Sequence, residues 1–599
     1  MGFSQLLDFL GGAWMERKHT VSLCMIVKNE ESCLRRCLDS LTGIVDEIII
    51  VDTGSTDKTV EIAKEFDAII KPYQWKNDFA DARNYALSFA TKDWILVLDA
   101  DEYLRQSDRD LLISSLNDVS NDCYFIKTLN FTTSANDENY MVNLNQRIFK
   151  NHKGFKYIGS IHEQVQYFGN EANRLPNKII DVGFYHTGYL RETVELKNKP
   201  QRNIEILTKI LEKEPENSFH KFNLANEMYQ LQKYDEAIKL YDEAYYSSNS
   251  SQGFMPKLIV FRINAFMAHQ DFKKALEAVN EGIKIYPTYT HLMFLKATLE
   301  EESGLITKAI DSYEACLKLG KPSPEFEFSE NSHGPWPHLK LAALYEKYQD
   351  YEKAIQHYNE FLGFDGRQYQ VLYQIATCLK KLGFKEEMMV TQLEKYIKPN
   401  SINHLILLAD LLLKQSYFEM ASRYLQSPTN QTNSQLIYLY AKQQFYLGNY
   451  EESIKTFKEY LIYDKFETIA HYFYLMYLVT NNEALSLEKM DYPNSIKNLH
   501  HAYQQEDASK LTEVDMNMLI LLIEESLITE QDEVRIQLAT IEKLTYYHPL
   551  TIRLAATYLK YGKKEEAEAL MVKIITQEQK LEKDTLYLLN QLIINRIDM

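Results

Sequence analysis

Two patterns of hydrophobic and polar residues divide this chain. Between about residues 21 and 185, apolar runs of strand length ("VSLCMIV", "VDEIIIVD", "DAIIKPY" and "WILVLDADE") alternate with segments whose apolar residues recur at helical spacing. Nearly continuous apolar strands separated by amphipathic helices indicate a parallel sheet with helices on both faces. The first third of the chain is therefore predicted to be an α/β domain.

From about residue 192 the pattern is helical throughout, and a repeat appears. The segment "KFNLANEMYQLQKYDEAIKLYDEAY" at 221–245 has the tetratricopeptide pattern, in which a small residue lies where two helices cross. The equivalent positions are Ala237, Ala275, Ala309, Ala354, Ala421, Ser453 and Ala567. Copies at 368–398 and 484–548 are degenerate. Because each repeat buries its apolar face only by stacking on its neighbours, we predict an all-α superhelix with a concave face.

These patterns predict three regions: an N-terminal appendage at residues 1–18, an α/β domain at 19–190, and a helical linker with a repeat array at 191–599. The appendage is apolar, but it lacks a basic start and Asp8 interrupts it, so we do not expect a signal peptide. No stretch is long and apolar enough to span a bilayer. Six cysteines are too few for a disulfide framework, and a cytoplasmic protein is expected.

The net charge of -18 argues against a nucleic-acid-binding protein, because phosphate contacts need an excess of Lys and Arg. A small basic pocket for one diphosphate is still compatible with this charge. The 42 tyrosines fall largely in the repeats. We expect most of them to pack between helices, and a minority on the concave face could hold a peptide.

Polar residues follow the predicted strands of the α/β domain. Ligands of such sheets bind at the carboxyl ends of the strands, and this rule places Asn29, Asp52 and Asp99 along one rim. Asp99 and Asp101 form a D-x-D motif at the end of an apolar strand, where two carboxylates can address one hard cation. A lone D-x-D is often a solvated turn, but its position favours a site for Mg²⁺ or Mn²⁺ with a diphosphate.

Four segments together carry a resemblance to a known family. The segments "SLCMIVKNEE", "EIIIVDTGSTDKT", "FADARNYAL" and "WILVLDADE" resemble, in order and spacing, the motifs of family 2 glycosyltransferases, which have the GT-A fold. With its C-terminal repeats, the chain is similar to the sublancin-type peptide S-glycosyltransferases. The resemblance implies a nucleotide-sugar donor (a UDP-hexose above all), a divalent cation, and inversion at the anomeric carbon.

The resemblance also implies roles for individual residues. Asn29 and Glu30 would lie beside the nucleotide, Asp52 would bind the base, Arg83 would neighbour the nucleotide or diphosphate, Asp99 would contact the ribose or the metal, and Asp101 would bind the metal. The alternative for Arg83 is an ion pair on a helix surface, and the alternative for Asp52 is an ordinary strand-to-helix turn.

A base is needed to take the acceptor's proton during inversion. The pair His162–Glu163 in "GFKYIGSIHEQV" lies downstream of the D-x-D motif, and Glu163 is the predicted base, with His162 positioning it or contacting the donor phosphate. The alternative is a salt-bridged loop. His186 in "VGFYHTGY" is predicted to complete the metal shell or touch the diphosphate, and the alternative is a core histidine bonded to a carbonyl.

The sequence allows more than one acceptor and more than one class of function. We expect a peptide or protein acceptor, modified on Cys or on Ser/Thr and held partly by the repeats. One alternative is transfer to a cell-surface glycan or a lipid-linked acceptor, and another is a tetratricopeptide scaffold with an inactive sugar-nucleotide domain. Similar enzymes can be dimeric, so a homodimer is also compatible with the resemblance.

Overall fold

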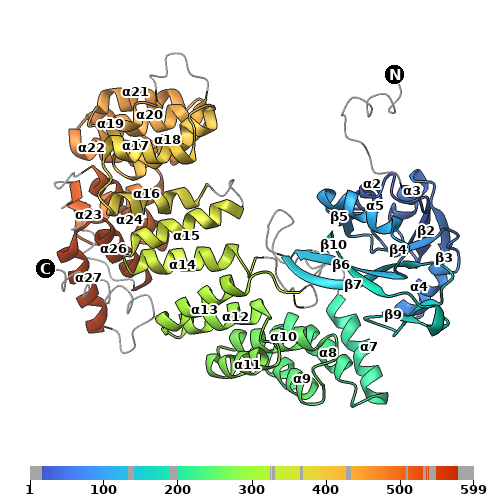
Figure 1. Ribbon diagram of the computed structural model, residues 1–599. Helices are drawn as coiled ribbons and strands as arrows, with labels where there is room; N and C mark the ends of the chain where they lie inside the picture. The colour runs from blue at the N-terminus through green and yellow to red at the C-terminus, as the bar shows by residue number, and fades with distance from the viewer. Residues whose placement is uncertain are drawn as a thin grey trace, which may run out of the picture. The chain divides into compact units, whose positions relative to one another are not determined.

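The computed structural model describes residues 17–131, 140–187, 199–323, 326, 331–364, 369–425, 433–507, 510–529, 534–535, 537–538 and 548–577 (Figure 1). Nearly all of the predicted N-terminal appendage lies outside these residues. The chain divides into two compact units, Met1–Arg367 and Gln368–Met599. The change from strands to helices occurs inside the first unit, so the first helical repeats belong to the same compact body as the sheet.

The α/β domain is built on one eight-stranded sheet in the order β3-β2-β1-β4-β7-β6-β10-β5, with a separate two-stranded sheet of β8 and β9. The strands are β1 (Val21–Val27), β2 (Glu47–Asp52), β3 (Ile69–Pro72), β4 (Trp94–Val97), β5 (Glu102–Leu104), β6 (Cys123–Phe131), β7 (Tyr140–Lys150), β8 (Phe155–Ile158), β9 (Gln164–Tyr167) and β10 (Asn177–His186).

The four strands predicted from the sequence pair in parallel, and the strands that follow them along the chain add antiparallel pairs to the same sheet. Strands β1 to β4 run parallel to one another, whereas β7 is antiparallel to both β4 and β6, and β5 is antiparallel to β10. The prediction of a parallel sheet is therefore confirmed for the four strands on which it rested. Strands β6 and β7 are antiparallel because the short link between them allows a hairpin but no helical crossover.

Helices cover both faces of the sheet, as predicted. The helices of the domain are α2 (Leu34–Ser40), α3 (Thr59–Glu65), α4 (Phe79–Leu87) and α5 (Arg109–Asn117). Leu23 and Met25 of β1 join a core cluster with residues of α2, α3 and α5, whereas Cys24 joins a second cluster with residues of α4 and β8. Side chains that alternate along a strand point to opposite faces, so β1 is buried on both sides.

The helical part of the first unit contains α7 (Lys199–Lys213), α8 (Ser218–Gln230), α9 (Tyr234–Tyr246), α10 (Met255–Ala268), α11 (Phe272–Ile285), α12 (Thr290–Glu302), α13 (Ile306–Leu319), α14 (Pro335–Lys347) and α15 (Tyr351–Phe364). In the second unit lie α16 (Val371–Lys381), α17 (Glu386–Tyr396), α18 (Ile402–Lys414), α19 (Phe418–Ala421), α20 (Ser434–Tyr446), α21 (Tyr450–Tyr460), α22 (Ala470–Thr480), α23 (Asn494–Gln505), α24 (Glu513–Ile528), α26 (His548–Lys560) and α27 (Lys564–Gln577).

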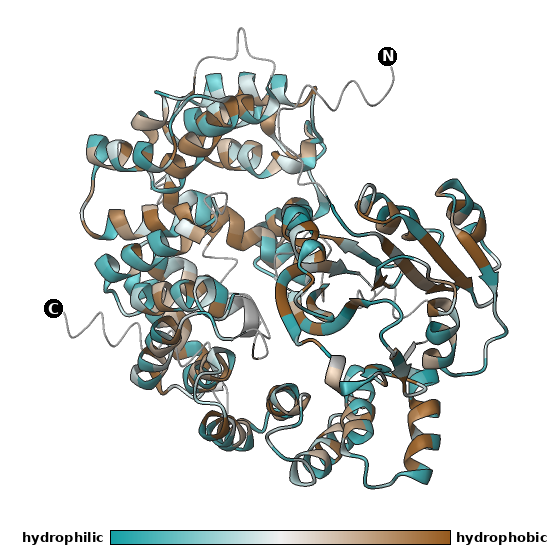
Figure 2. Cartoon of the chain, turned by 45° about the vertical axis from the view of Figure 1, so that its right-hand side comes forward, coloured by the Kyte–Doolittle hydropathy of each residue, from teal (hydrophilic) through white to brown (hydrophobic). Residues whose placement is uncertain are grey.

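The small residues predicted at the helix crossings are buried without exception. All seven have an exposed fraction of 0%, and each lies in the second helix of a pair: Ala237, Ala275, Ala309, Ala354, Ala421, Ser453 and Ala567. Many helices carry hydrophobic and hydrophilic residues on different sides, as the brown and teal segments show (Figure 2). In the described part of the chain, no helix combines the length and hydrophobicity that crossing a bilayer requires.

The turns between paired helices share one backbone feature. A residue with positive φ ends the first helix of eight pairs: Gln232, Gln270, Gly304, Gln349, Gly383, Ser416, Gly448 and Gly562. Glycine adopts this left-handed conformation without a steric penalty, whereas residues with a Cβ atom adopt it at a cost in free energy. The same turn is therefore built with glycine in four pairs and with Gln or Ser in the other four.

Candidate functional site

The carboxyl ends of β2, β1 and β4 are neighbours, as the sequence predicts. Val27 at the end of β1 pairs with Asp52 at the end of β2, and β4 pairs with the other edge of β1. Asp52 Oδ1 accepts a hydrogen bond of 3.0 Å from the backbone N–H of Ser55. Asn29, which has a φ of 55°, accepts one of 2.8 Å from the backbone N–H of Thr56. These two side chains therefore fix the loop between β2 and α3.

Glu30 follows Asn29 in the same region. Its backbone N–H donates to Thr59 Oγ1 at 2.7 Å, and its Oε2 lies 3.1 Å from Cys33 Sγ. Asn29, Glu30 and Asp52 thus form one group at the ends of β1 and β2. None of the three residues lines the cavity that lies beside Asp99.

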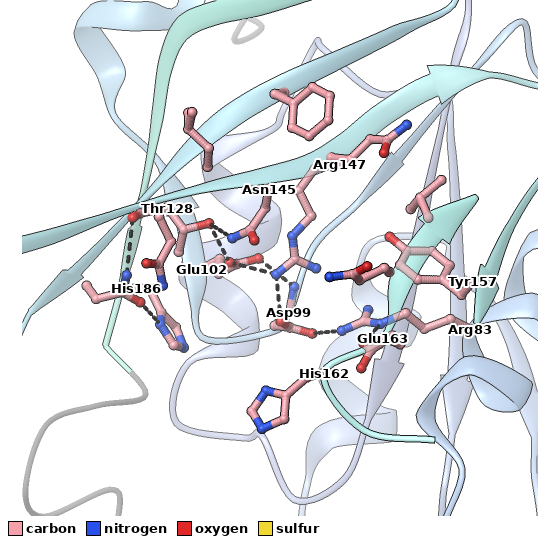
Figure 3. A pocket seen from close by; sticks show the side chains of 17 residues that line it. Arg83, Asp99, Glu102, Thr128, Asn145, Arg147, Tyr157, His162, Glu163 and His186 are labelled. Atoms are coloured by element: carbon pink, nitrogen blue, oxygen red, sulfur yellow. Dashed lines mark hydrogen bonds and ion pairs between the residues drawn. The ribbon is translucent and has the colours of Figure 1, made fainter. Parts of the chain in front are cut away.

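A cavity of about 530 Å³ lies beside Asp99 (Figure 3). It brings together five of the residues predicted from sequence, Arg83, Asp99, His162, Glu163 and His186. These residues come from α4, from the segment after β4, from the loop between β8 and β9, and from the end of β10. Residues separated by about 100 positions in the chain therefore share one cavity.

Two arginines hold the acidic side chains of this cavity in place. Arg83 Nη2 lies 2.7 Å from Asp99 Oδ1, and its Nε lies 2.5 Å from Glu163 Oε1. Arg147 of β7 contacts Asp99 Oδ2 and Glu102 Oε1, each at 3.0 Å. Asp99 is therefore bound by two guanidinium groups, and Arg83 links it directly to the predicted base, Glu163.

The electrostatic environment distinguishes Asp99 from Glu102. Burial alone would raise the pKa of Asp99, but Arg83 and Arg147 outweigh it and hold that pKa well below its usual range. Burial raises the pKa of Glu102, and the neighbouring Asp99 charge adds to this effect despite the contact with Arg147. Asp99 is thus ionised at neutral pH, whereas Glu102 protonates more readily than an ordinary glutamate.

Asp101 lies against His186 rather than against the arginines. Asp101 Oδ1 is 3.4 Å from His186 Nε2, and His186 Nδ1 is 2.7 Å from Asn130 Oδ1. Burial lowers the pKa of His186, but Asp101 more than compensates, so this pKa is raised overall. An imidazole that is held at one nitrogen and faces a carboxylate at the other is a common arrangement around metal ions.

The residues present can bind a divalent cation only if phosphate oxygens of a bound nucleotide sugar supply further ligands. Among the described residues, no group of three His, Cys, Asp or Glu side chains could hold a metal ion by itself. Mg²⁺ typically takes one or two carboxylates and binds phosphate oxygens and water in its other positions. Asp101 with His186 offers such a partial set. The predicted metal contact of Asp99 has less support, because both of its oxygens contact arginines.

Four polar atoms of the cavity wall are buried and have no hydrogen-bond partner within the described part of the chain. They are Arg83 Nη1, Arg147 Nε, Tyr157 Oη and His162 Nε2. Burial lowers the pKa of His162 to about 4, so its ring is neutral at pH 7. Since buried polar atoms normally find partners, this wall is complementary to an oxygen-rich ligand.

Arg147 and Tyr157 are two of the cavity residues that sequence reasoning did not assign to the site. A signal for Arg147 was present, because it ends a polar group in β7 with Asn143, Asn145 and Gln146, all of which line the cavity. Tyr157 in β8 has no comparable signal, since an isolated tyrosine in a strand is most often a packing residue.

Comparisons with known proteins agree with this geometry. Residues 22–195 match the family description "Glycosyl transferase family 2", and residues 390–460 match "Anaphase-promoting complex, cyclosome, subunit 3". The glycosyltransferase SunS of Bacillus subtilis (strain 168), described as derived from the SPbeta prophage, is 32% identical over 250 residues. That alignment covers 40% of this chain and 57% of SunS.

A TPR repeat-containing protein of Synechococcus elongatus is 33% identical over 225 residues, which cover 35% of this chain and 52% of that protein. This chain thus spans little more than half the length of these relatives. Among solved structures, YrrB, described as a TPR protein with an unusual peptide-binding site, has 15% identity and a TM-score of 0.26 and covers 34% of this chain and 97% of its own. Those two values are too low for a conclusion about this chain.

The sheet order, the D-x-D motif at the end of β4 and the family match all concern the same segment of the chain. Residues 22–195 therefore form a glycosyl transferase family 2 domain, and the helices that follow it resemble tetratricopeptide repeats.

Proposed function

We propose that the protein is a metal-dependent, inverting glycosyltransferase that moves a sugar from a nucleotide sugar to a peptide or protein. The observation that carries this proposal is the cavity in which Asp99 of the D-x-D motif lies opposite Glu163, with Arg83 contacting both. Direct displacement needs groups that bind the nucleotide sugar and a separate carboxylate that accepts the proton of the acceptor.

The donor side of the proposal uses the rim of the sheet. Asp52, Asn29 and Glu30 at the ends of β1 and β2 would bind the nucleotide, for which a UDP-hexose is the leading candidate. Asp101 and His186 would hold Mg²⁺ or Mn²⁺, which would neutralise the charge of the leaving diphosphate when bound. The unpaired donor atoms of Arg83 and Arg147 would then bind oxygens of the sugar diphosphate.

Glu163 is the proposed base. It lies at the wall of the cavity, and Arg83 Nε binds its Oε1, which orients the carboxylate toward the space beside Asp99. Glu163 would accept the proton of a hydroxyl or thiol while the acceptor's oxygen or sulfur bonds to the anomeric carbon and the bond from that carbon to the nucleoside diphosphate breaks. The neutral ring of the adjacent His162 would contact the reacting groups through Nε2 without adding charge.

A peptide or protein acceptor is proposed because helical repeats follow the transferase domain within the same compact unit. Such repeats typically present extended surfaces that bind polypeptides. The acceptor side chain would be Cys or Ser/Thr, and a thiol would need less help from Glu163 because its ordinary pKa of about 8.5 leaves a fraction of it ionised at neutral pH. Transfer to a cell-surface glycan or lipid-linked acceptor is the alternative within the same reaction class.

Calorimetric titration tests the proposal directly. UDP-glucose, UDP-N-acetylglucosamine and GDP-mannose are each titrated with Mn²⁺ and with EDTA, into the wild type and into Asp101→Asn and Glu163→Gln. We expect one donor to bind only with Mn²⁺, binding to be lost in Asp101→Asn, and binding to persist in Glu163→Gln without turnover. A folded protein that binds none of the donors would refute the proposal in favour of a scaffold with an inactive domain.

A further inference from the structure

The hairpin of β6 and β7 is attached to the helical repeats at two points. The side chain of Met141 packs against the core cluster of helices α8 to α12. Two residues further along β7, Asn143 Oδ1 accepts a hydrogen bond of 2.7 Å from Lys257 Nζ of α10. Asn143 also lines the cavity. The helices therefore reach the wall of the candidate site through one strand.

A chain of hydrogen bonds continues from Met141 to the D-x-D motif. Asn130 Nδ2 donates to the carbonyl oxygen of Met141 at 3.0 Å and to that of Thr128 at 3.2 Å. Since both of its amide hydrogens are directed at carbonyl groups, Asn130 Oδ1 is the acceptor for His186 Nδ1. His186 then carries its hydrogen on Nδ1, and its Nε2 faces Asp101.

The loop with the proposed base is attached to the same helices. Ile161, which directly precedes His162 and Glu163, is 4% exposed and forms an apolar cluster with Leu207 of α7 and Leu224 of α8. His162 has a φ of 50°, a left-handed conformation that is uncommon for non-glycine residues and costs free energy that the surrounding structure must offset. Packing of Ile161 between the two helices contributes to that offset.

We propose that helices α7–α10 position both sides of the transfer site. Met141 acts through Asn130 to orient His186 toward Asp101, and Ile161 fixes the loop that presents Glu163. The two residues are positioning residues, because neither lines the cavity. This inference rests on the proposed function, and it makes the first repeats part of the transferase itself in addition to any role in holding an acceptor.

Ordinary packing between a sheet and its neighbouring helices would predict only a loss of stability when these contacts are removed. The proposal predicts that each contact affects a different property of the site. Metal and nucleotide binding depend on Met141, whereas turnover depends on Ile161. A control residue with equivalent packing but no link to the site separates the two explanations.

Met267 of α10 provides this control, because it is partly buried and packs against the same core cluster as Met141. The variants Met141→Ala, Met141→Leu and Met267→Ala are titrated with Mn²⁺ in the presence of UDP, and free Mn²⁺ is followed by electron paramagnetic resonance. We expect the Mn²⁺ dissociation constant to rise about tenfold in Met141→Ala, as is typical when support of a metal ligand is lost. Met141→Leu should restore it, and Met267→Ala should leave it unchanged.

The base side is tested with Ile161→Ala and Ile161→Leu. Turnover is measured without a known acceptor as hydrolysis of the sugar nucleotide, in which water takes the place of the acceptor and UDP is released. Ile161→Ala should lower the turnover number about tenfold with little change in KM, since a displaced catalytic group loses rate rather than donor affinity. Ile161→Leu should recover most of the rate.

The outcomes distinguish this inference from the proposed function. Wild-type protein that binds neither Mn²⁺ nor UDP would overturn both. Wild-type protein that binds them, with equal Mn²⁺ affinity in Met141→Ala and Met267→Ala and unchanged turnover in Ile161→Ala, would overturn the positioning role alone. Equal thermal stability of the two methionine variants shows that any difference in Mn²⁺ affinity is not a difference in folding.

Discussion

At the scale of single residues, Arg83 is the connection between the two halves of the candidate reaction. Its Nη2 binds Asp99, and its Nε binds Glu163. Lysine carries the same charge on a single nitrogen and cannot reproduce this fork. The identity of residue 83 as arginine is therefore as important as its charge.

We predict that Arg83→Lys lowers the turnover number at least about tenfold, because Glu163 loses its fixed orientation relative to the donor. Steady-state release of UDP from the sugar nucleotide measures this effect. Arg35→Lys is the matched control, since Arg35 pairs with Glu65 on the surface, where both side chains are about half exposed. Equal turnover in the two variants would contradict the role assigned to Arg83.

A second residue, Glu227 of α8, links stability to pH. Burial raises its pKa from 4.5 to about 7, although Asn203 Nδ2 donates to its Oε1 at 2.8 Å. Between these two values the unfolded chain has lost this proton while the folded chain keeps it. Raising the pH through this window therefore favours the unfolded state. The resulting loss in the free energy of unfolding is fully present above about pH 7.

Glu227→Gln removes this loss. We expect the variant to unfold at the same temperature as the wild type near pH 4.5 and to be more stable by about 2–3 kcal/mol at pH 8. Thermal unfolding of the full chain between pH 4.5 and 8 provides the comparison. The exposed Glu216→Gln should show no such trend, and a constant difference for Glu227→Gln across the range would contradict the prediction.

At the scale of elements, the repeated helix pairs share their turn but not the residue that makes it. Gln232 occupies the left-handed position between α8 and α9 with a φ of 60°, where Gly304, Gly383, Gly448 and Gly562 occupy the equivalent positions of other pairs. Glycine is therefore compatible with this turn in four other helix pairs of the same chain.

Gln232→Gly should stabilise the protein by about 0.5–1 kcal/mol, because relief of left-handed strain exceeds the added backbone entropy of the unfolded chain. Lys239→Gly is the control. It places the same residue at an exposed position in the interior of α9, where glycine costs about 1 kcal/mol. Thermal midpoints that move in opposite directions for the two variants would support the interpretation, and a decrease in both would contradict it.

The elements also show how far the sequence could be interpreted. The strands β1, β2 and β4 and the buried small residues of the repeats are local patterns, and they were predicted because burial imposes a period on the sequence. The antiparallel β7 and its Arg147 were not predicted. Their place depends on which strands pair across the sheet, and a single sequence does not reveal long-range pairing.

The same distinction applies to the site. Asp99, Arg83 and Glu163 were expected near a donor and now share a cavity, but their direct contacts join residues up to 80 positions apart. The residues that support His186, by contrast, were not foreseen. Asn130 and Met141 act through backbone carbonyls and packing, which leave no motif in the sequence.

At the scale of the whole molecule, the compact unit that contains the sheet extends to Arg367. We predict that a fragment of residues 1–367 folds cooperatively and binds the nucleotide with Mn²⁺. A fragment of residues 1–190 should bind it more weakly and aggregate, because removal of α7–α10 exposes Ile161 and Met141. Sedimentation and calorimetry of the two fragments decide this, and equal solubility and affinity would contradict the prediction.

The packing of Ile161 and Met141 against the first helices has a consequence for engineering. A chimera that exchanges acceptor preference between related proteins would ordinarily be joined where strands give way to helices. In this protein, a junction between the strands and the first helices would place foreign helices against Ile161 and Met141. We expect such a chimera to lose activity toward every acceptor. A junction after Arg367 instead keeps the native support, so the second unit is the portion of the chain that we expect to be exchangeable without disturbing the candidate site.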